Sequence, residues 1–132
     1  MSTTVIFPDT VLWLCGWLRP IVAANGFAGA RVSDRYKGDT AAEVWVQRDG
    51  GGQVDQVRER PRLRINCFAG GLSSSDVNNL ARTVAAAVLA APGNGPVKRA
   101  RILSGPTEVP EPDRNRRLLL VELDVIGVNF TA

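Results

Sequence analysis

The pattern of hydrophobic residues near the start of the sequence predicts a helix. Residues 8–25 are apolar on nearly every side of a helical projection, which is typical of a helix that is heavily buried or lies in an interface. Asp9 suits the start of this helix, and Asn25–Gly26 suits its end. Pro20 predicts a kink or a break, because proline lacks the N–H that a helix interior needs.

After residue 30 the pattern changes to the alternation that is typical of β-strands. A short strand is expected within 30–36 and a longer one from Ala42, followed by a flexible turn at Asp49–Gln53, which reads DGGGQ. Residues 62–67 then place apolar side chains on one side and polar ones on the other, as in a half-buried strand. Pro61 predicts a break or an edge position just before it.

A second helix is predicted over residues 73–90, where apolar residues recur on one face. These residues are Val77, Leu80, Ala81, Val84 and Val88. Strands are predicted over 97–104 and 116–128, separated by a proline- and charge-rich loop at 106–115. In the last strand, every second residue from Leu119 to Val125 is apolar and faces one side.

The predicted element order is α–β–β–β–α–β–β. Strands that follow one another through loops favour antiparallel pairing, so we expect an α+β fold with a mainly antiparallel sheet and two helices on one face. A length of 132 residues suits a single domain over 1–132, with the N-terminal helix at 8–25 and a core at 40–128. The apolar run at 11–18 is too short to span a bilayer, and no basic segment precedes it, so we expect a protein of the cytosol.

The composition lacks the residue type that is most often used in catalysis. The chain has no histidine, which is the commonest general base and metal ligand, and its net charge is only +3. Cys15 and Cys67 are far apart and form no CxxC motif, so we expect two buried thiols. We find no motif for a cofactor.

The glycine- and serine-rich turn at 69–76 is a candidate phosphate or catalytic site, because it lies between a strand and a helix. It lacks the lysine of a phosphate-binding loop, the third glycine of a dinucleotide site and the GxSxG of a hydrolase. Ser73 instead suits a helix N-cap, with Asp76 reaching back to it and Leu72 packing against Val77. We therefore expect a structural cap.

Two groups of carboxylates are candidates for chemistry. Glu108, Glu111 and Asp113 lie in the proline-rich loop, where they are either solvated or ligands of a hard cation. Glu122 and Asp124 lie two apart on one face of the last strand. Together the two groups leave open the alternative of a metal-assisted hydrolase.

The sheet face away from the helices is the candidate protein interface. Arg62 and Arg64 would form cross-strand pairs with Glu122 and Asp124 if their strands are neighbours. Trp45 lies on the same face, and arginine and tryptophan are favoured in protein interfaces. These five residues are our predicted interface.

Arginines also concentrate in 58–64, 98–101 and 114–117, which leaves open a small nucleic-acid-binding module. Such a module would interleave basic residues with exposed aromatic ones, and only Phe68 and Trp45 lie near these clusters. Solvated strand edges and protein contacts are the other interpretation.

The second half of the chain resembles a known family. The stretches RPRLRINCFAG, SSSDVNNLARTVAAAVL, VKRARILSGPTEVPEPD and RRLLLVELDVIG, within residues 40–128, are similar to tail terminator proteins of long-tailed bacteriophages, especially those that infect actinobacteria. The ending SGPTEVPEPD followed by basic residues and a long strand is the most specific part.

This resemblance implies a structural α+β protein without enzyme activity or cofactor. It implies a homo-oligomeric ring, hexameric in the family, that caps the tail tube at the head–tail junction of the virion. The implied partners are other copies of the chain, the tail tube protein and the head-closure protein. A neck or head-closure protein is the alternative within phage assembly.

Overall fold

The computed structural model describes residues 3–38, 42–68, 73–110 and 115–131. Its helices are α1 (Thr10–Ala24) and α2 (Ser74–Leu89). Its strands are β1 (Thr3–Ile6), β2 (Arg31–Ser33), β3 (Glu43–Gln53), β4 (Arg58–Phe68), β5 (Val97–Glu108), β6 (Arg116–Ile126) and β7 (Val128–Thr131).

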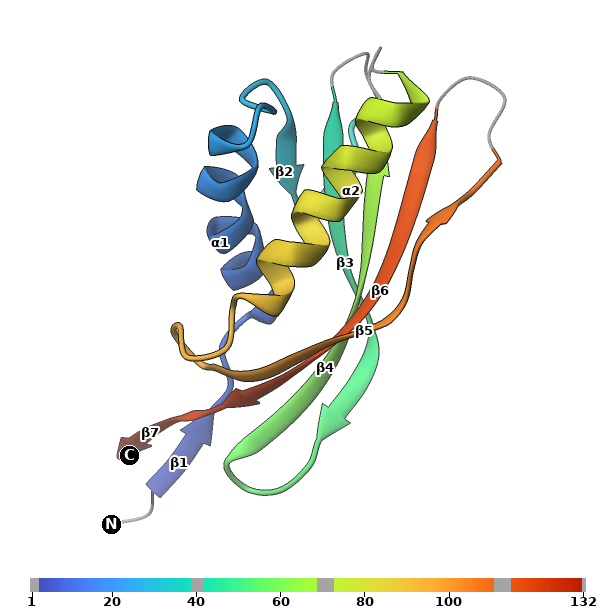
Figure 1. The fold of residues 1–132 in the computed structure, drawn as a ribbon. Helices are drawn as coiled ribbons and strands as arrows, with labels where there is room; N and C mark the ends of the chain where they lie inside the picture. The colour runs from blue at the N-terminus through green and yellow to red at the C-terminus, as the bar shows by residue number, and fades with distance from the viewer. Residues whose placement is uncertain (1–2, 39–41, 69–72, 111–114, 132) are drawn as a thin grey trace.

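The predicted α+β fold is confirmed. Five strands form a sheet in the order β2-β3-β4-β6-β5, in which all neighbours are antiparallel except β2 and β3. Both helices cover one face of this sheet, and we call the opposite face the outer face (Figure 1). The structure adds β1 and β7, which pair with each other in a separate two-stranded ribbon.

The core lies between the helices and the sheet. The five predicted residues of α2 are fully buried there, together with the alternate residues Leu119 to Val125 of β6. The Trp17 indole of α1 donates a hydrogen bond to the Ala87 carbonyl of α2 at 2.8 Å, which joins the two helices. Among the described residues, no helix is long and apolar enough to cross a membrane.

The expected break in α1 at Pro20 is absent. The helix continues through Pro20 to Ala24. Pro20 lies on the exposed side, while Leu18 and Val22 on either side of it are buried. Packing of this buried stripe therefore outweighs the one helical hydrogen bond that proline removes.

The expected flexible turn at Asp49–Gln53 is wrong, because these residues belong to β3. The pairing of β3 with β4 shifts between Arg48 and Gly51, as in a β-bulge. Gly51 has φ of +77°, and a Cβ there would lie 2.2 Å from the Arg60 carbonyl. The glycines thus allow a bulge within the strand.

Pro61 neither breaks β4 nor marks an edge of the sheet. It is buried and lies opposite Gly51 beside the bulge, while the β4–β6 pairs pass from Glu59 directly to Arg62. Proline lacks a backbone N–H, and Pro61 lies where the pairing of β4 with β3 and its pairing with β6 are both irregular.

The turn between β3 and β4 is instead formed around Asp55. Its carboxylate accepts hydrogen bonds from the backbone N–H groups of Val57 and Arg58, both at 2.9 Å. The bond from Val57, together with the Arg58 side chain, lowers the pKa of Asp55. A side-chain-capped turn thus replaces the glycine turn that the sequence pattern favoured.

Ser73 is the N-cap of α2, as predicted. The Ser73 hydroxyl accepts a hydrogen bond from the Asp76 N–H at 3.1 Å. Arg117 of β6 donates to the Ser74 hydroxyl at 3.0 Å and so fixes the first turn of the helix to the sheet. Leu72, the expected partner of Val77, lies outside the described residues.

Candidate protein interface on the outer face of the sheet

The five residues predicted for the interface all lie on the outer face. Trp45 is on β3, Arg62 and Arg64 are on β4, and Glu122 and Asp124 are on β6. Strands β4 and β6 are neighbours, with Arg62 in register with Glu122. Alternation along each strand explains this placement, because the residues between them are buried against the helices.

Arg62 lies directly opposite Glu122, as the cross-strand prediction expected, but the hydrogen bonds of the two β6 carboxylates go to other arginines. Asp124 accepts a hydrogen bond from Nε of Arg60 at 2.6 Å, and this bond raises the pKa of the arginine. Glu122 accepts from Nε of Arg101 on β5 at 2.9 Å. Arg60 and Arg101 are thus interface candidates that the sequence analysis did not select, although both lie in the basic clusters that it noted.

Arg62 and Arg64, which were expected to pair with β6, instead contact Asp49. Nε of Arg62 donates to the Asp49 carbonyl at 2.9 Å, and Nη2 of Arg64 lies 3.3 Å from Oδ2 of Asp49. The bulge brings Asp49 to this position, and Gly50 leaves room for the Arg62 guanidinium, which lies 2.9 Å from where a Cβ would be. The pairing therefore depends on an irregularity that alternation cannot predict.

The charges form two rows across three strands. In one row, Glu122 of β6 lies between Arg62 of β4 and Arg101 of β5. In the next row, Asp124 is in register with Arg99 of β5 and bonded to Arg60 of β4. Each row places one carboxylate between two guanidinium groups, so each carries a surplus of positive charge.

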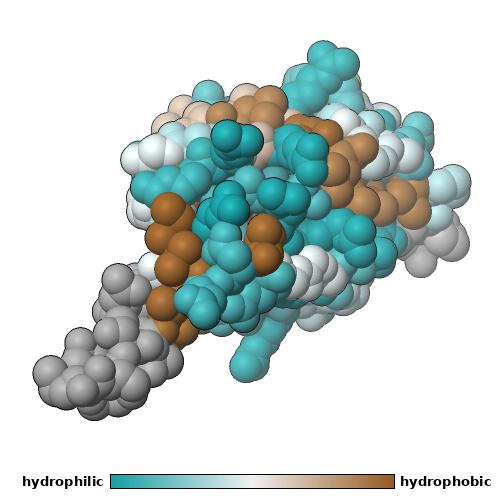
Figure 2. Space-filling view, turned by 90° about the horizontal axis from the view of Figure 1, so that it is seen from below, coloured by the Kyte–Doolittle hydropathy of each residue, from teal (hydrophilic) through white to brown (hydrophobic). Residues whose placement is uncertain are grey.

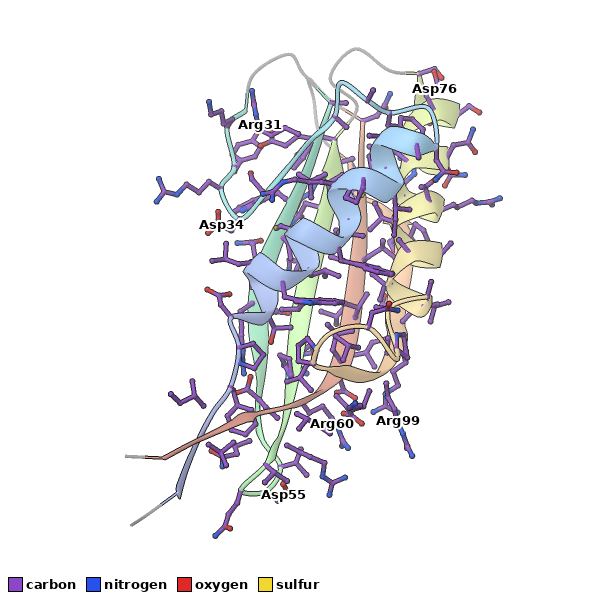
Figure 3. The ribbon with its side chains drawn as sticks, turned by 90° about the vertical axis from the view of Figure 1, so that its left-hand side faces the viewer. Arg31, Asp34, Asp55, Arg60, Asp76 and Arg99 are labelled. Atoms are coloured by element: carbon purple, nitrogen blue, oxygen red, sulfur yellow. The ribbon has the colours of Figure 1, made fainter. Side chains whose placement is uncertain are left out.

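A pocket of about 450 Å³ lies along these rows. Its charged lining residues are Arg60, Lys98, Arg99, Arg101, Glu122 and Asp124. Figure 3 shows Arg60 and Arg99 at the same end of the sheet as the Asp55 turn, opposite the end that carries Asp76. Neither Lys98 nor Arg99 forms an ion pair with a carboxylate within the described part of the chain.

The other end of the outer face is covered rather than open. Glu43 is fully buried there, and its carboxylate accepts hydrogen bonds from the backbone N–H groups of Lys37 and Gly38, at 2.7 and 3.4 Å. Tyr36 packs against both Trp45 and Phe68, with ring centroids 5.1 Å apart in each pair. Trp45 is therefore only half exposed.

A buried polar network lies beside this aromatic cluster. Asn66 has no exposed surface, and its amide donates to Oε1 of Gln47 at 3.2 Å and accepts from Arg116. The Arg116 guanidinium also lies over the Phe68 ring at 5.4 Å. The sequence pattern placed Asn66 among solvent-facing residues and did not single out Glu43, because both are buried by contacts with other segments of the chain.

The described carboxylates do not gather into a metal site. No group of three or more potential ligands is present among the residues that the structure covers. Glu108 is in register with Arg117, five residues along β6 from Glu122, which corresponds to roughly 17 Å. Glu111 and Asp113 lie outside the described residues.

The two cysteines are buried free thiols, as predicted. Burial raises the pKa of Cys15 from 9.0 to about 11 and that of Cys67 to about 12. Both thiols are therefore in the neutral, unreactive form at physiological pH.

Comparison of the sequence with protein-family models and with curated protein sequences found no match.

Proposed function

We propose that this chain is a structural protein of a long-tailed bacteriophage, a tail terminator that forms a ring on the end of the tail tube. The rows of arginine and carboxylate residues on the outer face carry this proposal. They cross β4, β6 and β5 on a sheet face that neither helix covers. Arginine is enriched in protein interfaces relative to the rest of the surface.

The resemblance of residues 40–128 to tail terminators supports the same function. A ring of identical subunits needs a heterologous interface, in which one surface of a copy meets a different surface of the next. The surplus of positive charge at Lys98 and Arg99 favours an acidic surface as the partner of this face.

The experiment is electron microscopy of the purified protein with and without tail tubes of the same phage. The proposal expects rings at one end of the tube and tubes that stop growing once the ring is bound. Rings that bind the head connector and ignore the tube would instead assign a neck or head-closure function.

A charge-reversal pair tests the role of the outer face. Arg64→Glu should weaken ring assembly at least about tenfold, because it places a second acid beside Asp49 within the interface. Arg82→Glu makes the same change of charge on an exposed position of α2 and should leave assembly unchanged. Equal behaviour of the two variants in light scattering would contradict the interface.

A nucleic-acid-binding function is the second candidate, and the cationic pocket lining favours it. Nucleic-acid affinity that falls steeply with salt and is lost in Lys98→Ala/Arg99→Ala would support it. A gel assay without any shift at low salt would remove it.

A further inference from the structure

Strands β1 and β7 form a ribbon that stands away from the rest of the molecule (Figure 1). They pair antiparallel over four residues each, from Thr3 opposite Thr131 to Ile6 opposite Val128. Within the described residues each strand has one strand neighbour, so each presents one unpaired edge. A two-stranded ribbon of this length is marginal in water on its own.

The base of the ribbon is firmly held by the body of the protein. The N–H of Gly127 donates to the Val57 carbonyl at 2.9 Å, and the N–H of Ile126 donates to the Pro96 carbonyl at 3.0 Å. A Cβ on Gly127 would lie 2.3 Å from Cγ1 of Val5, so the two chain segments cross in close contact. The body therefore sets the direction in which the ribbon projects.

The ribbon lacks the features that protect the edges of the main sheet. The β5 edge carries Lys98, Arg99 and Arg101 and has three register shifts, and the β2 edge is only three residues long. Short strands, basic residues and bulges are the usual means of preventing unwanted strand pairing. The sequences TTVI and VNFT contain no charge and no proline and are rich in β-branched residues.

Apolar side chains are exposed where the ribbon leaves the body. Ile6 is 52% exposed, Val57 44% and Ile126 37%. Figure 2, which views the molecule from this lower side, shows hydrophobic side chains among a largely hydrophilic surface. A partner strand beside the ribbon would satisfy the free backbone groups of its edges.

We infer that the ribbon pairs edge to edge with the ribbon of a second copy of this chain. The free edge of β1 in one copy lies antiparallel to the free edge of β7 in the next. The two strands have the same length of four residues, so a free β1 edge and a free β7 edge can pair along their whole length. Their lack of charge matters because the whole chain carries a net charge of +3, and an uncharged contact brings no like charges together.

This contact joins two different edges, so it is heterologous and can repeat around a ring. The repetition of this contact around a closed ring rests on the proposed function. The pairing of two ribbons does not, since it can occur without a tail tube.

Disulfide trapping between two variants tests the contact. Thr3→Cys and Thr131→Cys are prepared separately, mixed and oxidised. The native Cys15 and Cys67 are buried, so a disulfide-linked dimer reports on the introduced thiols. The mixture should cross-link at least about tenfold faster than either variant alone. If one variant alone cross-linked as fast as the mixture, the pairing of β1 in one copy with β7 in the next would be wrong.

Ser104→Cys supplies the matched control, because this exposed residue lies on the protected β5 edge. Mixed with Thr3→Cys, it should cross-link no faster than Thr3→Cys alone. Amide hydrogen exchange gives a second readout on the unaltered protein, in which residues 3–6 and 128–131 should become protected as protein concentration rises. Oligomers whose ribbon amides stay unprotected would overturn the ribbon contact and leave the ring proposal standing. Ribbons that pair in a protein that does not cap tail tubes would overturn the ring proposal and leave the ribbon contact standing.

Discussion

The two faces of the sheet are built from the same strands but differ in their side chains and in the contacts that these make. On the inner face, Leu119, Val121, Leu123 and Val125 of β6 are fully buried against the helices. On the outer face, the carboxylates Glu122 and Asp124 between them are half exposed and bind arginines of the neighbouring strands. The inner face removes apolar surface from water, whereas the outer face presents directional contacts between charged groups.

This difference determines how each face responds to change. Burial is non-directional, so the inner face depends on volume and apolar character. Exposed ion pairs contribute little to stability, so the outer face is free to serve recognition. The covered end of the outer face is an exception, because Glu43 and Asn66 are buried polar groups that need their hydrogen bonds.

The largest effect is expected from a matched pair of leucines on opposite faces. Leu119→Ala removes a fully buried side chain and should lower the free energy of unfolding by about 2–5 kcal/mol. Leu120→Ala makes the same change one residue along on the half-exposed outer face and should cost about 1 kcal/mol or less. Urea denaturation measures both, and equal losses would mean that the two faces do not differ as described.

The bulge in β3 is tested by two adjacent glycines. Gly51→Ala places a Cβ against the Arg60 carbonyl at a φ of +77°, and should destabilise the protein by roughly 1–3 kcal/mol. Gly52→Ala meets no atom within 4 Å and should change stability by less than about 0.5 kcal/mol. Thermal unfolding of the two variants distinguishes a bulge from a flexible turn, in which both substitutions would be tolerated.

The covered end of the outer face depends on a single carboxylate. Glu43→Ala leaves the N–H groups of Lys37 and Gly38 without that acceptor and should cost about 1–3 kcal/mol. Trp45 fluorescence should shift to longer wavelength as Tyr36 leaves the indole. In Glu108→Ala, a control at an exposed carboxylate, both the stability and the emission should stay near those of the unaltered protein.

The smallest expected effect is on the pH dependence of stability, through the two buried thiols. An unfolded thiol ionises near pH 9.0, whereas burial raises the pKa of Cys15 to about 11 and that of Cys67 to about 12. The folded state therefore holds these protons more tightly, and their contribution is complete below pH 9.0 and is lost as pH rises toward the folded pKa values. Cys15→Ala/Cys67→Ala should show a flatter decline of stability in that range, and an unchanged slope would contradict the assignment.

The sequence by itself determined the inner face and the fold class. Helical periodicity in α2 and strand alternation in β4 and β6 identified core residues that are buried in the structure, because each pattern follows from the geometry of one element. The same alternation correctly placed the five interface candidates on the outer face. The Ser73 cap was also predictable, since a cap joins residues three apart.

Only the tertiary structure decided which of these charges meet. Arg60 pairs with Asp124 and Arg101 with Glu122, because the β3 bulge and the position of β5 set the registers between strands. The cover of Trp45 by Tyr36 and the ribbon of β1 and β7 join residues from separate parts of the chain. Periodicity along one segment carries no information about such contacts, because they depend on how the segments are placed relative to one another in three dimensions.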